Sequence, residues 1–156
     1  MHVDNLKNAL QGIMRGEVSN EEGARREASR DTSLFERMPE LVVYPVDAND
    51  VSELVRVVDA ERSRGAEISV TARSAGTDMS GGPLTTSIVV SFTKHMNSML
   101  EVLPAQAGGD GYAVTEPGVF YRDFEKATME KGLIMPSYPP SREIPAKGRI
   151  VANHPR

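Results

Sequence analysis

The 156-residue sequence predicts an α+β fold, in which a strand–helix–strand unit is followed by antiparallel structure. Apolar residues recur at helical spacing over Val51–Val58, and this segment lies between two runs that favour strands. Further along the chain, the turn-forming segment Gly108–Gly111 separates two more strand-like runs, which is typical of a hairpin. Together these patterns predict one mixed domain rather than an all-helical or all-strand protein.

Composition excludes several classes of protein. The chain has the length of one ordinary domain, 39% of its residues are apolar, and its net charge is −4, which disfavours a general nucleic-acid binder. It contains no cysteine, so disulfide frameworks, thiolate metal sites and cysteine nucleophiles are excluded. No apolar run is long enough to span a bilayer and no secretory signal is visible, so we expect a cytoplasmic protein, and membrane attachment is not indicated.

The first 38 residues differ in composition from the remainder. They are polar and rich in charge, with weak helical periodicity at Leu6, Leu10, Ile13 and Met14. We therefore expect a partly helical leader at 1–38 that lies outside the core, and a domain at 39–156.

The strand–helix–strand unit opens this domain. An apolar run over Glu40–Pro45 predicts the first strand, and Ile68–Ala72 alternates as a half-buried strand does. Between them, Asp47 or Asn49 is placed to cap the helix and Gly65 to end it.

The second half continues with five more predicted elements. We expect a buried strand, the two strands of the hairpin, a helix that buries Phe120, Phe124 and Ala127 and stops at Gly132, and a last short strand. The four strands are expected at Ile88–Phe92, Met99–Leu103, Tyr112–Thr115 and Leu133–Pro136.

A loop of small and hydroxyl-bearing residues, Arg73–Pro83, follows the second strand. Its backbone amides could form a nest for phosphate oxygens, helped by the charge of Arg73 and by hydroxyls, or the loop could be a tight structural turn. The hydroxyls belong to Ser74, Thr77 and Ser80. The loop matches neither the Walker motif nor the G-x-G-x-x-G dinucleotide motif.

The loop "TARSAGTDMSGG" (71–82), behind "PELVVYPVDANDVSELVRVV", resembles the pyrophosphate loop of FAD-linked oxidases and dehydrogenases of the vanillyl-alcohol oxidase, or PCMH, type. Four further segments match in the order of that family, so the resemblance covers residues 29–153. They are "SRDTSLFERMPE", "SIVVSFTKHMNSMLEV", "VTEPGVFYRDFEKATMEKGLIMP" and "PPSREIPAKGRIVAN". Within this family the chain is similar to D-lactate dehydrogenase and glycolate oxidase-like proteins.

The resemblance implies two α+β subdomains with FAD held between them. It implies that a run of backbone amides wraps the pyrophosphate, that two later loop residues continue this cradle, and that a proline–glycine pair passes close to the cofactor. These residues are Ser74, Ala75, Gly76, Thr77 and Asp78, then Ser80 and Gly81, then Pro117 and Gly118. A last segment with Pro140, Ser141 and Gly148 is expected along the isoalloxazine and pyrophosphate.

Two departures from the family pattern affect the cofactor. Some relatives attach FAD covalently through a histidine that follows the loop glycine, and Thr77 stands there, so we expect noncovalent FAD. Near the end of the chain, Arg149 replaces the second glycine of the family pattern. This arginine could pair with pyrophosphate, point away from the site or close it.

The resemblance implies the FAD-binding portion of a flavin-dependent oxidoreductase, which oxidises a small 2-hydroxy acid or alcohol by hydride transfer to flavin N5. We expect the chain to be a fragment whose missing C-terminal region meets the small-molecule substrate, so no catalytic residue is assigned. His2, His95 and His154 are isolated, and no metal site is expected. The alternatives are a stand-alone flavin- or nucleotide-binding module, a regulatory subunit without catalysis, or a truncated product.

Overall fold

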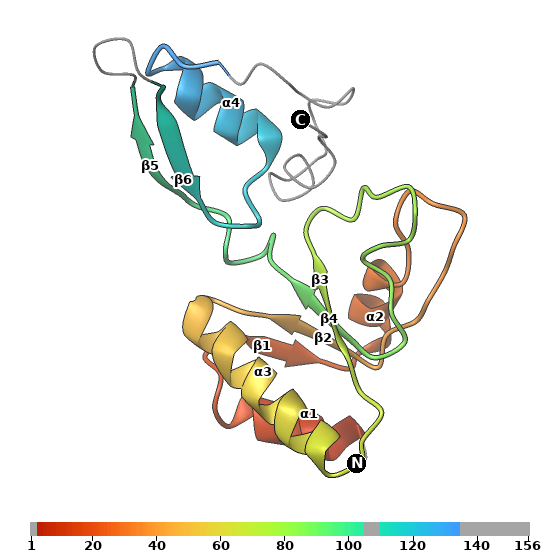
Figure 1. Cartoon of the computed structure of the whole chain (residues 1–156). Helices are drawn as coiled ribbons and strands as arrows, with labels where there is room; N and C mark the ends of the chain where they lie inside the picture. Colours follow the sequence, from red (N-terminus) through yellow and green to blue (C-terminus); the bar gives the residue numbers. More distant parts are fainter. Residues whose placement is uncertain (1–2, 105–109, 135–156) are drawn as a thin grey trace.

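The computed structural model describes residues 3–104 and 110–134, which form two lobes (Figure 1). A four-stranded sheet with three helices builds the larger lobe, and a two-stranded sheet with one helix builds the smaller. The expected α+β fold is confirmed. No helix within the described ranges is long and apolar enough to cross a membrane.

The larger sheet has the strand order β1-β2-β4-β3. Its three parallel strands are β2 (Leu41–Tyr44), β4 (Ile88–Ser91) and β3 (Val70–Arg73), and β1 (Glu17–Ser19) pairs antiparallel with β2. The sequence analysis placed Ile88–Phe92 in antiparallel structure, which is wrong, because β4 lies parallel between β2 and β3. Every residue of β4 is buried, as expected for a central parallel strand covered on both faces.

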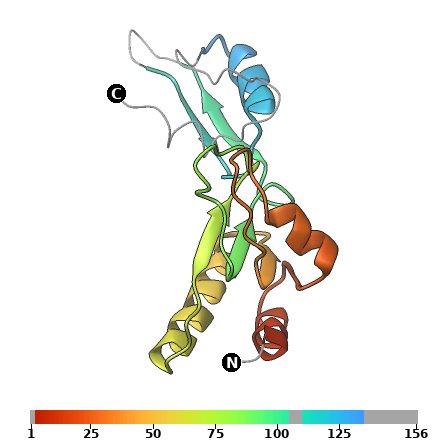
Figure 2. The ribbon, with the colours of Figure 1, turned by 90° about the vertical axis from the view of Figure 1, so that its right-hand side faces the viewer.

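Helices cover both faces of this sheet (Figures 1 and 2). On one face, α1 (Val3–Gln11) and α3 (Ala48–Ser63) pack on alternate residues of β2 and β4. On the other face, α2 (Glu22–Ala28) packs through Ala28 on Val42 and Val89. This alternation follows from the two-residue period of a strand.

The N-terminal residues are part of the core, which corrects the expectation of a leader outside it. Leu6, Leu10, Met14 and Val18 are all buried and cluster with apolar residues of β2, α3 and β4. Sparse apolar residues in a charged segment sufficed, because one face of α1 presents Leu6 and Leu10 to the sheet. Met14 follows the helix, and Val18 lies in β1. The division of the chain at residue 38 itself stays a prediction.

The expected helix after the first strand is confirmed as α3. Asp47 is its N-cap, and its side chain accepts hydrogen bonds from the amides of Asn49 and Asp50 at 2.9 and 3.0 Å. Gly65 follows the helix with φ of +92°, the left-handed conformation that glycine adopts without strain.

The smaller lobe contains the expected hairpin, β5 (Met99–Leu103) and β6 (Tyr112–Thr115), and α4 (Tyr121–Met129). Its core consists of Val119, Tyr121 and Phe124, with Met99 and Ala113 packed against it.

Three details of the smaller lobe differ from the predicted helix and last strand. Phe120 is the N-cap of α4 and not part of its buried face, and Ala127 is absent from the buried core. Gly132 ends the helical turn with φ of +71°, as expected. Leu133 and Ile134 are not in a strand, and the rest of that expected strand, to Pro136, lies outside the described residues.

A buried carboxylate ties the N-terminal segment to the first turn of α3. Asp50 is 3% exposed and accepts hydrogen bonds from the amides of Arg15, Gly16 and Val46 at 2.9, 2.8 and 2.9 Å. Burial raises the pKa of Asp50, but the three amides outweigh that effect and hold the pKa below its ordinary value. The charged form of Asp50 therefore stabilises the fold.

We expect Asp50→Asn to lower the free energy of unfolding by about 2 kcal/mol at pH 7, because an amide cannot accept all three bonds. The folded-state pKa is depressed, so the contribution of Asp50 is present above the unfolded pKa of about 3.9 and lost as pH falls through the folded value. Urea unfolding at pH 7 and at about pH 2.5 gives the free energy of unfolding of both proteins. The difference between wild type and variant should be smaller at the lower pH. Asp59→Asn, on the exposed face of α3, is the control. If the loss of stability in Asp50→Asn did not depend on pH, the role assigned to the charge of Asp50 would be contradicted.

Candidate cofactor site

The small-residue loop connects the carboxyl end of β3 to the amino end of β4, over residues 74–87. It lies beside the segment that joins α2 to β2, and the two run together in both views (Figures 1 and 2). The amide and hydroxyl of Thr32 donate to the carbonyl of Asp78 at 3.1 and 2.7 Å. Segments far apart in the sequence thus build one corner of the molecule.

Arg73 anchors the start of this loop to the end of α2. Its guanidinium donates to the carbonyl oxygens of Arg30, Glu27 and Ala28 at 2.8, 3.4 and 3.5 Å. Burial lowers the pKa of Arg73, while the charges of nearby carboxylates oppose that shift. The guanidinium is thus engaged by protein carbonyls, and its contact with a phosphate stays a prediction.

Two glycines in the loop have left-handed backbones. Gly76 has φ of +64°, and a Cβ there would overlap the guanidinium of Arg73. Gly81 has φ of +82°, and a Cβ there would come within 3.0 Å of the Phe35 ring. Glycine is needed at both positions because of the backbone conformation and because of a close neighbour.

Asp78 folds the second half of the loop around its own carboxylate. The carboxylate accepts from the amides of Met79 and Gly82 at 2.8 Å each and from the hydroxyl of Ser80 at 2.9 Å. The Ser80 hydroxyl, followed by the backbone amides, lowers the pKa of Asp78 and more than offsets its partial burial. Its negative charge is thereby satisfied within the loop, and so is the hydroxyl of Ser80.

The first half of the loop carries hydrogen-bond donors without acceptors. Within the described residues, no acceptor pairs with the backbone amides of the run that follows β3, which are those of Ser74, Ala75, Gly76, Thr77 and Asp78. The hydroxyl of Thr77, a residue only 7% exposed, is buried without a partner, and so is Oδ2 of Asp31. Buried polar groups are normally paired, so the amides and the Thr77 hydroxyl, which are donors, fit an anionic ligand such as a phosphate. The Asp31 oxygen is an acceptor and does not contribute to this fit.

The proline–glycine pair of the smaller lobe lies next to the loop. The hydroxyl of Ser74 donates to the carbonyl of Pro117 at 3.0 Å. Gly118 donates its amide to Met96 at 2.8 Å, and a Cβ there would overlap the carbonyl of Phe92. Gly118 therefore permits close backbone packing between β6 and the segment that follows β4.

A cavity of about 260 Å³ lies where the two lobes meet. It is lined by Arg73, Ser74 and Ala75 together with four residues that the sequence analysis missed, Glu27, Ser91, Thr93 and Phe120. Ser91 and Thr93 could have been found, because the carboxyl ends of parallel strands meet at one edge and ligands bind there. Glu27 and Phe120 carry no such signal, since only tertiary packing brings α2 and α4 to this edge.

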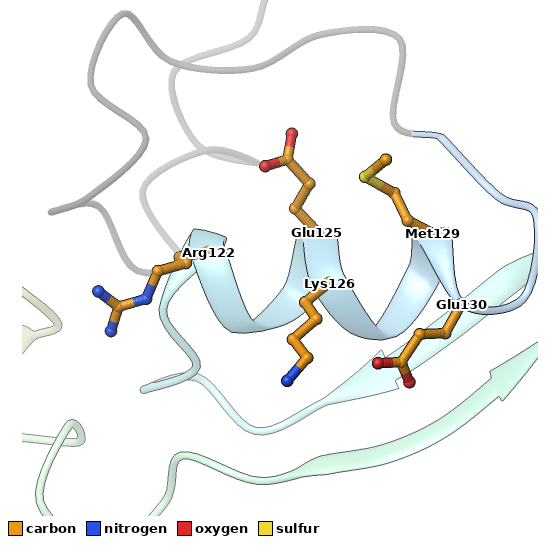
Figure 3. Close-up of a pocket in the computed structure, with 5 residues that line it drawn as sticks. All are labelled: Arg122, Glu125, Lys126, Met129 and Glu130. Carbon is orange, nitrogen blue, oxygen red and sulfur yellow. The ribbon is translucent and has the colours of Figure 1, made fainter.

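A larger but open pocket of about 520 Å³ lies on the outer surface of α4 (Figure 3). Among the described residues its lining comes from α4 and its C-cap Glu130. Glu125 and Met129 point to one side, and Lys126 and Glu130 point to the other. The side chains do not converge, so the pocket has none of the features of a cofactor site.

The remaining expected residues are placed as follows. Pro140, Ser141, Gly148 and Arg149 lie outside the described residues. Among residues 3–104 and 110–134 no group of three or more His, Asp or Glu side chains is placed to hold a metal ion. His95 contacts Oε1 of Glu17 at 2.9 Å, and the same carboxylate accepts from Lys94 at 2.6 Å.

Three comparisons with known proteins bear on this site. A family model described as "FAD binding domain" matches residues 39–147, which include the loop and every lining residue of the cavity except Glu27. Among curated proteins, a D-2-hydroxyglutarate dehydrogenase of Pseudomonas putida is 34% identical over 88 residues, 56% of this chain and 8% of that protein. A D-2-hydroxyglutarate dehydrogenase of Escherichia coli is 30% identical over 104 residues, 67% of this chain and 10% of that protein.

Solved structures share the fold. An alkyldihydroxyacetonephosphate synthase superposes with a TM-score of 0.77 at 17% identity, over 96% of this chain and 29% of that chain. A 4-ethylphenol oxidase of Gulosibacter chungangensis superposes with a TM-score of 0.67 at 24% identity, over 83% of this chain and 24% of that chain. A p-cresol methylhydroxylase superposes with a TM-score of 0.65 at 17% identity, over 83% of this chain and 25% of that chain.

These matches confirm the expected PCMH-type fold and the cofactor class. The chain spans about a tenth or less of the length of the curated relatives it matches. The curated relatives are dehydrogenases, and the solved neighbours include an oxidase and a hydroxylase of the same fold. The chain therefore belongs to the FAD binding domain family.

Proposed function

We propose that this chain holds the pyrophosphate of FAD on the loop after β3, as part of a flavin-dependent dehydrogenase. The observation that carries the proposal is the run of amides from Ser74 to Asp78, which have no acceptor among residues 3–104 and 110–134, beside the buried hydroxyl of Thr77, which has no partner there either. Phosphate oxygens are the acceptors that such a run of amides favours. Ser80 and Gly81 continue the cradle, and Pro117 and Gly118 form its neighbouring wall.

Each part of the loop has a definite task in this proposal. The amides and the Thr77 hydroxyl donate to the phosphates, while Arg73 holds the loop on α2 and adds positive charge close by. The cavity between the lobes excludes water from the groups that follow the pyrophosphate. In the described residues we assign only binding and orientation, and the roles of Pro140, Ser141 and Gly148 stay predictions.

The substitution Thr77→Val tests this assignment by separating binding from folding. Valine has nearly the same shape but no hydroxyl, so the variant removes an unsatisfied buried group and leaves the stability of the FAD-free protein equal or higher. The dissociation constant for FAD should rise roughly 10-fold, since a hydrogen bond to a charged phosphate is lost. Flavin-fluorescence titration and the thermal midpoint of the FAD-free protein measure the two effects.

Thr128→Val is the matched control for this test. Thr128 is buried in α4, and its hydroxyl donates to the carbonyls of Phe124 and Glu125 at 3.0 Å each. Its loss should lower stability and leave FAD affinity unchanged, which is the opposite signature. If Thr77→Val binds FAD as tightly as the wild-type protein does, the assignment of the Thr77 hydroxyl to the phosphate is refuted.

FAD is held noncovalently in this proposal. The position after Gly76 carries Thr77, whose alcohol is a poor nucleophile and whose side chain is buried inside the loop. We expect acid precipitation of the FAD-loaded protein to release all of the flavin into the supernatant. Flavin that migrates with the denatured polypeptide in gel electrophoresis would contradict this expectation.

We further propose that the substrate of the whole protein is a small 2-hydroxy acid. When bound, FAD supplies the acceptor for a hydride from the hydroxy-bearing carbon, and the acid becomes a 2-oxo acid as the hydroxyl proton is lost. The similarity to D-2-hydroxyglutarate dehydrogenases supports this class. A cytoplasmic location stays a prediction from the sequence.

Anaerobic addition of D-2-hydroxyglutarate to the FAD-loaded whole protein, of which this chain is the proposed cofactor-binding part, should bleach the visible absorbance of the flavin. The L enantiomer, in which the hydride lies on the other face of the carbon, serves as the control. Stable FAD binding without bleaching by any 2-hydroxy acid would favour the alternative of a binding module or regulatory subunit.

A further inference from the structure

Thr32 makes the most direct contact between the α2–β2 segment and the phosphate loop. Its hydroxyl lies 2.7 Å from the carbonyl oxygen of Asp78 and 3.1 Å from that of Thr77, and its amide donates to the Asp78 carbonyl at 3.1 Å. Forty-five or more positions separate these residues in sequence. The single hydroxyl proton is shared between two carbonyl oxygens, with the shorter contact to Asp78.

These contacts set the orientation of two peptide planes. In a trans peptide the carbonyl and the amide of the next residue point in opposite directions. Because the carbonyls of Thr77 and Asp78 point toward Thr32, the amides of Asp78 and Met79 point away from it. The Met79 amide is taken by the Asp78 carboxylate, which leaves the Asp78 amide as the unpartnered donor.

The alternative orientation would harm anion binding. If the Thr77–Asp78 peptide plane turned over, the carbonyl oxygen of Thr77 would replace the Asp78 amide on the ligand side of the loop and would repel a phosphate. Nothing covalent prevents that rotation in a loop rich in glycine and serine. The hydrogen bonds of Thr32 oppose it before any ligand arrives.

The segment that carries Thr32 is itself held rigidly. Arg30 and Glu36 form a backbone bridge and a 2.5 Å ion pair across it, and the amide of Arg37 donates to the carbonyl of Ser29 at 2.9 Å. The amide of Ser33 donates to the carboxylate of Asp31 at 2.8 Å. Phe35 supports the loop at a second point beneath Gly81. A fixed segment is what a positioning group requires.

We propose that Thr32 is a positioning residue for FAD, which acts on the cofactor only through the Thr77 and Asp78 peptides. This inference rests on the proposed function of the loop. Thr32 keeps two carbonyls away from the phosphate side, so the loop is ordered in the binding conformation before FAD arrives. Preorganisation of this kind raises affinity without a contact to the ligand.

The test compares Thr32→Val with the wild-type protein in the full chain, by two measurements. Hydrogen exchange of the FAD-free protein should show faster exchange of the amides of Thr32 and Met79, which are the hydrogen-bonded amides at this contact. FAD titration should give a dissociation constant about 3- to 10-fold higher. Thr32→Ser keeps the hydroxyl and should restore both values. Thr86→Val, at an exposed loop threonine, is the matched control and should change neither.

The two measurements separate this inference from the proposed function. If the wild-type protein binds FAD but Thr32→Val has unchanged exchange and unchanged affinity, the positioning role is overturned and the FAD site stands. Thr32→Ser as weak as Thr32→Val would also overturn it, because the hydroxyl would then be irrelevant. If the wild-type protein binds no FAD, the proposed function fails. The exchange data then decide by themselves whether Thr32 orders the loop.

Discussion

The parallel pairing of β3 with β4 is the constraint on which the site depends. A chain that leaves the carboxyl end of one strand must run back along the sheet to begin a parallel neighbour, and this usually takes a helix. Here residues 74–87 make the return as an irregular loop. Without a helix to pair its amides, the start of the loop keeps donors free at the edge of the sheet where ligands of parallel sheets bind.

Such a loop must be held in place by groups outside it. Arg73 fastens its first residue to the end of α2, Thr32 holds its middle, and the carboxylate of Asp78 closes its second half. Ser74 connects it to Pro117 in the other lobe. These contacts engage carbonyls and side chains, and no acceptor in the described part of the chain takes the amides from Ser74 to Asp78. Local donors of this kind let a protein with a net charge of −4 hold an anionic cofactor.

Most elements with strong local patterns were predictable. Helix α3 has a cap, a period and a terminating glycine, and the two hairpin strands follow from the strand-like runs on either side of a glycine-rich sequence, so local rules sufficed. The prediction failed where packing decides. The few apolar residues of the first 38 positions enter the core because α1 gathers Leu6 and Leu10 on one face. Phe120 caps α4 because Val119 and Tyr121 take the buried places.

The sequence by itself determined the cofactor class, because the small-residue loop after a strand, its glycines and four further segments in family order are local features of the chain. Only the tertiary structure decided how the loop is used. Hydrogen bonds between residues more than 40 positions apart determine that Arg73 faces α2 and that Thr32 holds the loop carbonyls. No period or spacing encodes such contacts, since they arise when β4 inserts between β2 and β3 and brings distant segments to one edge of the sheet.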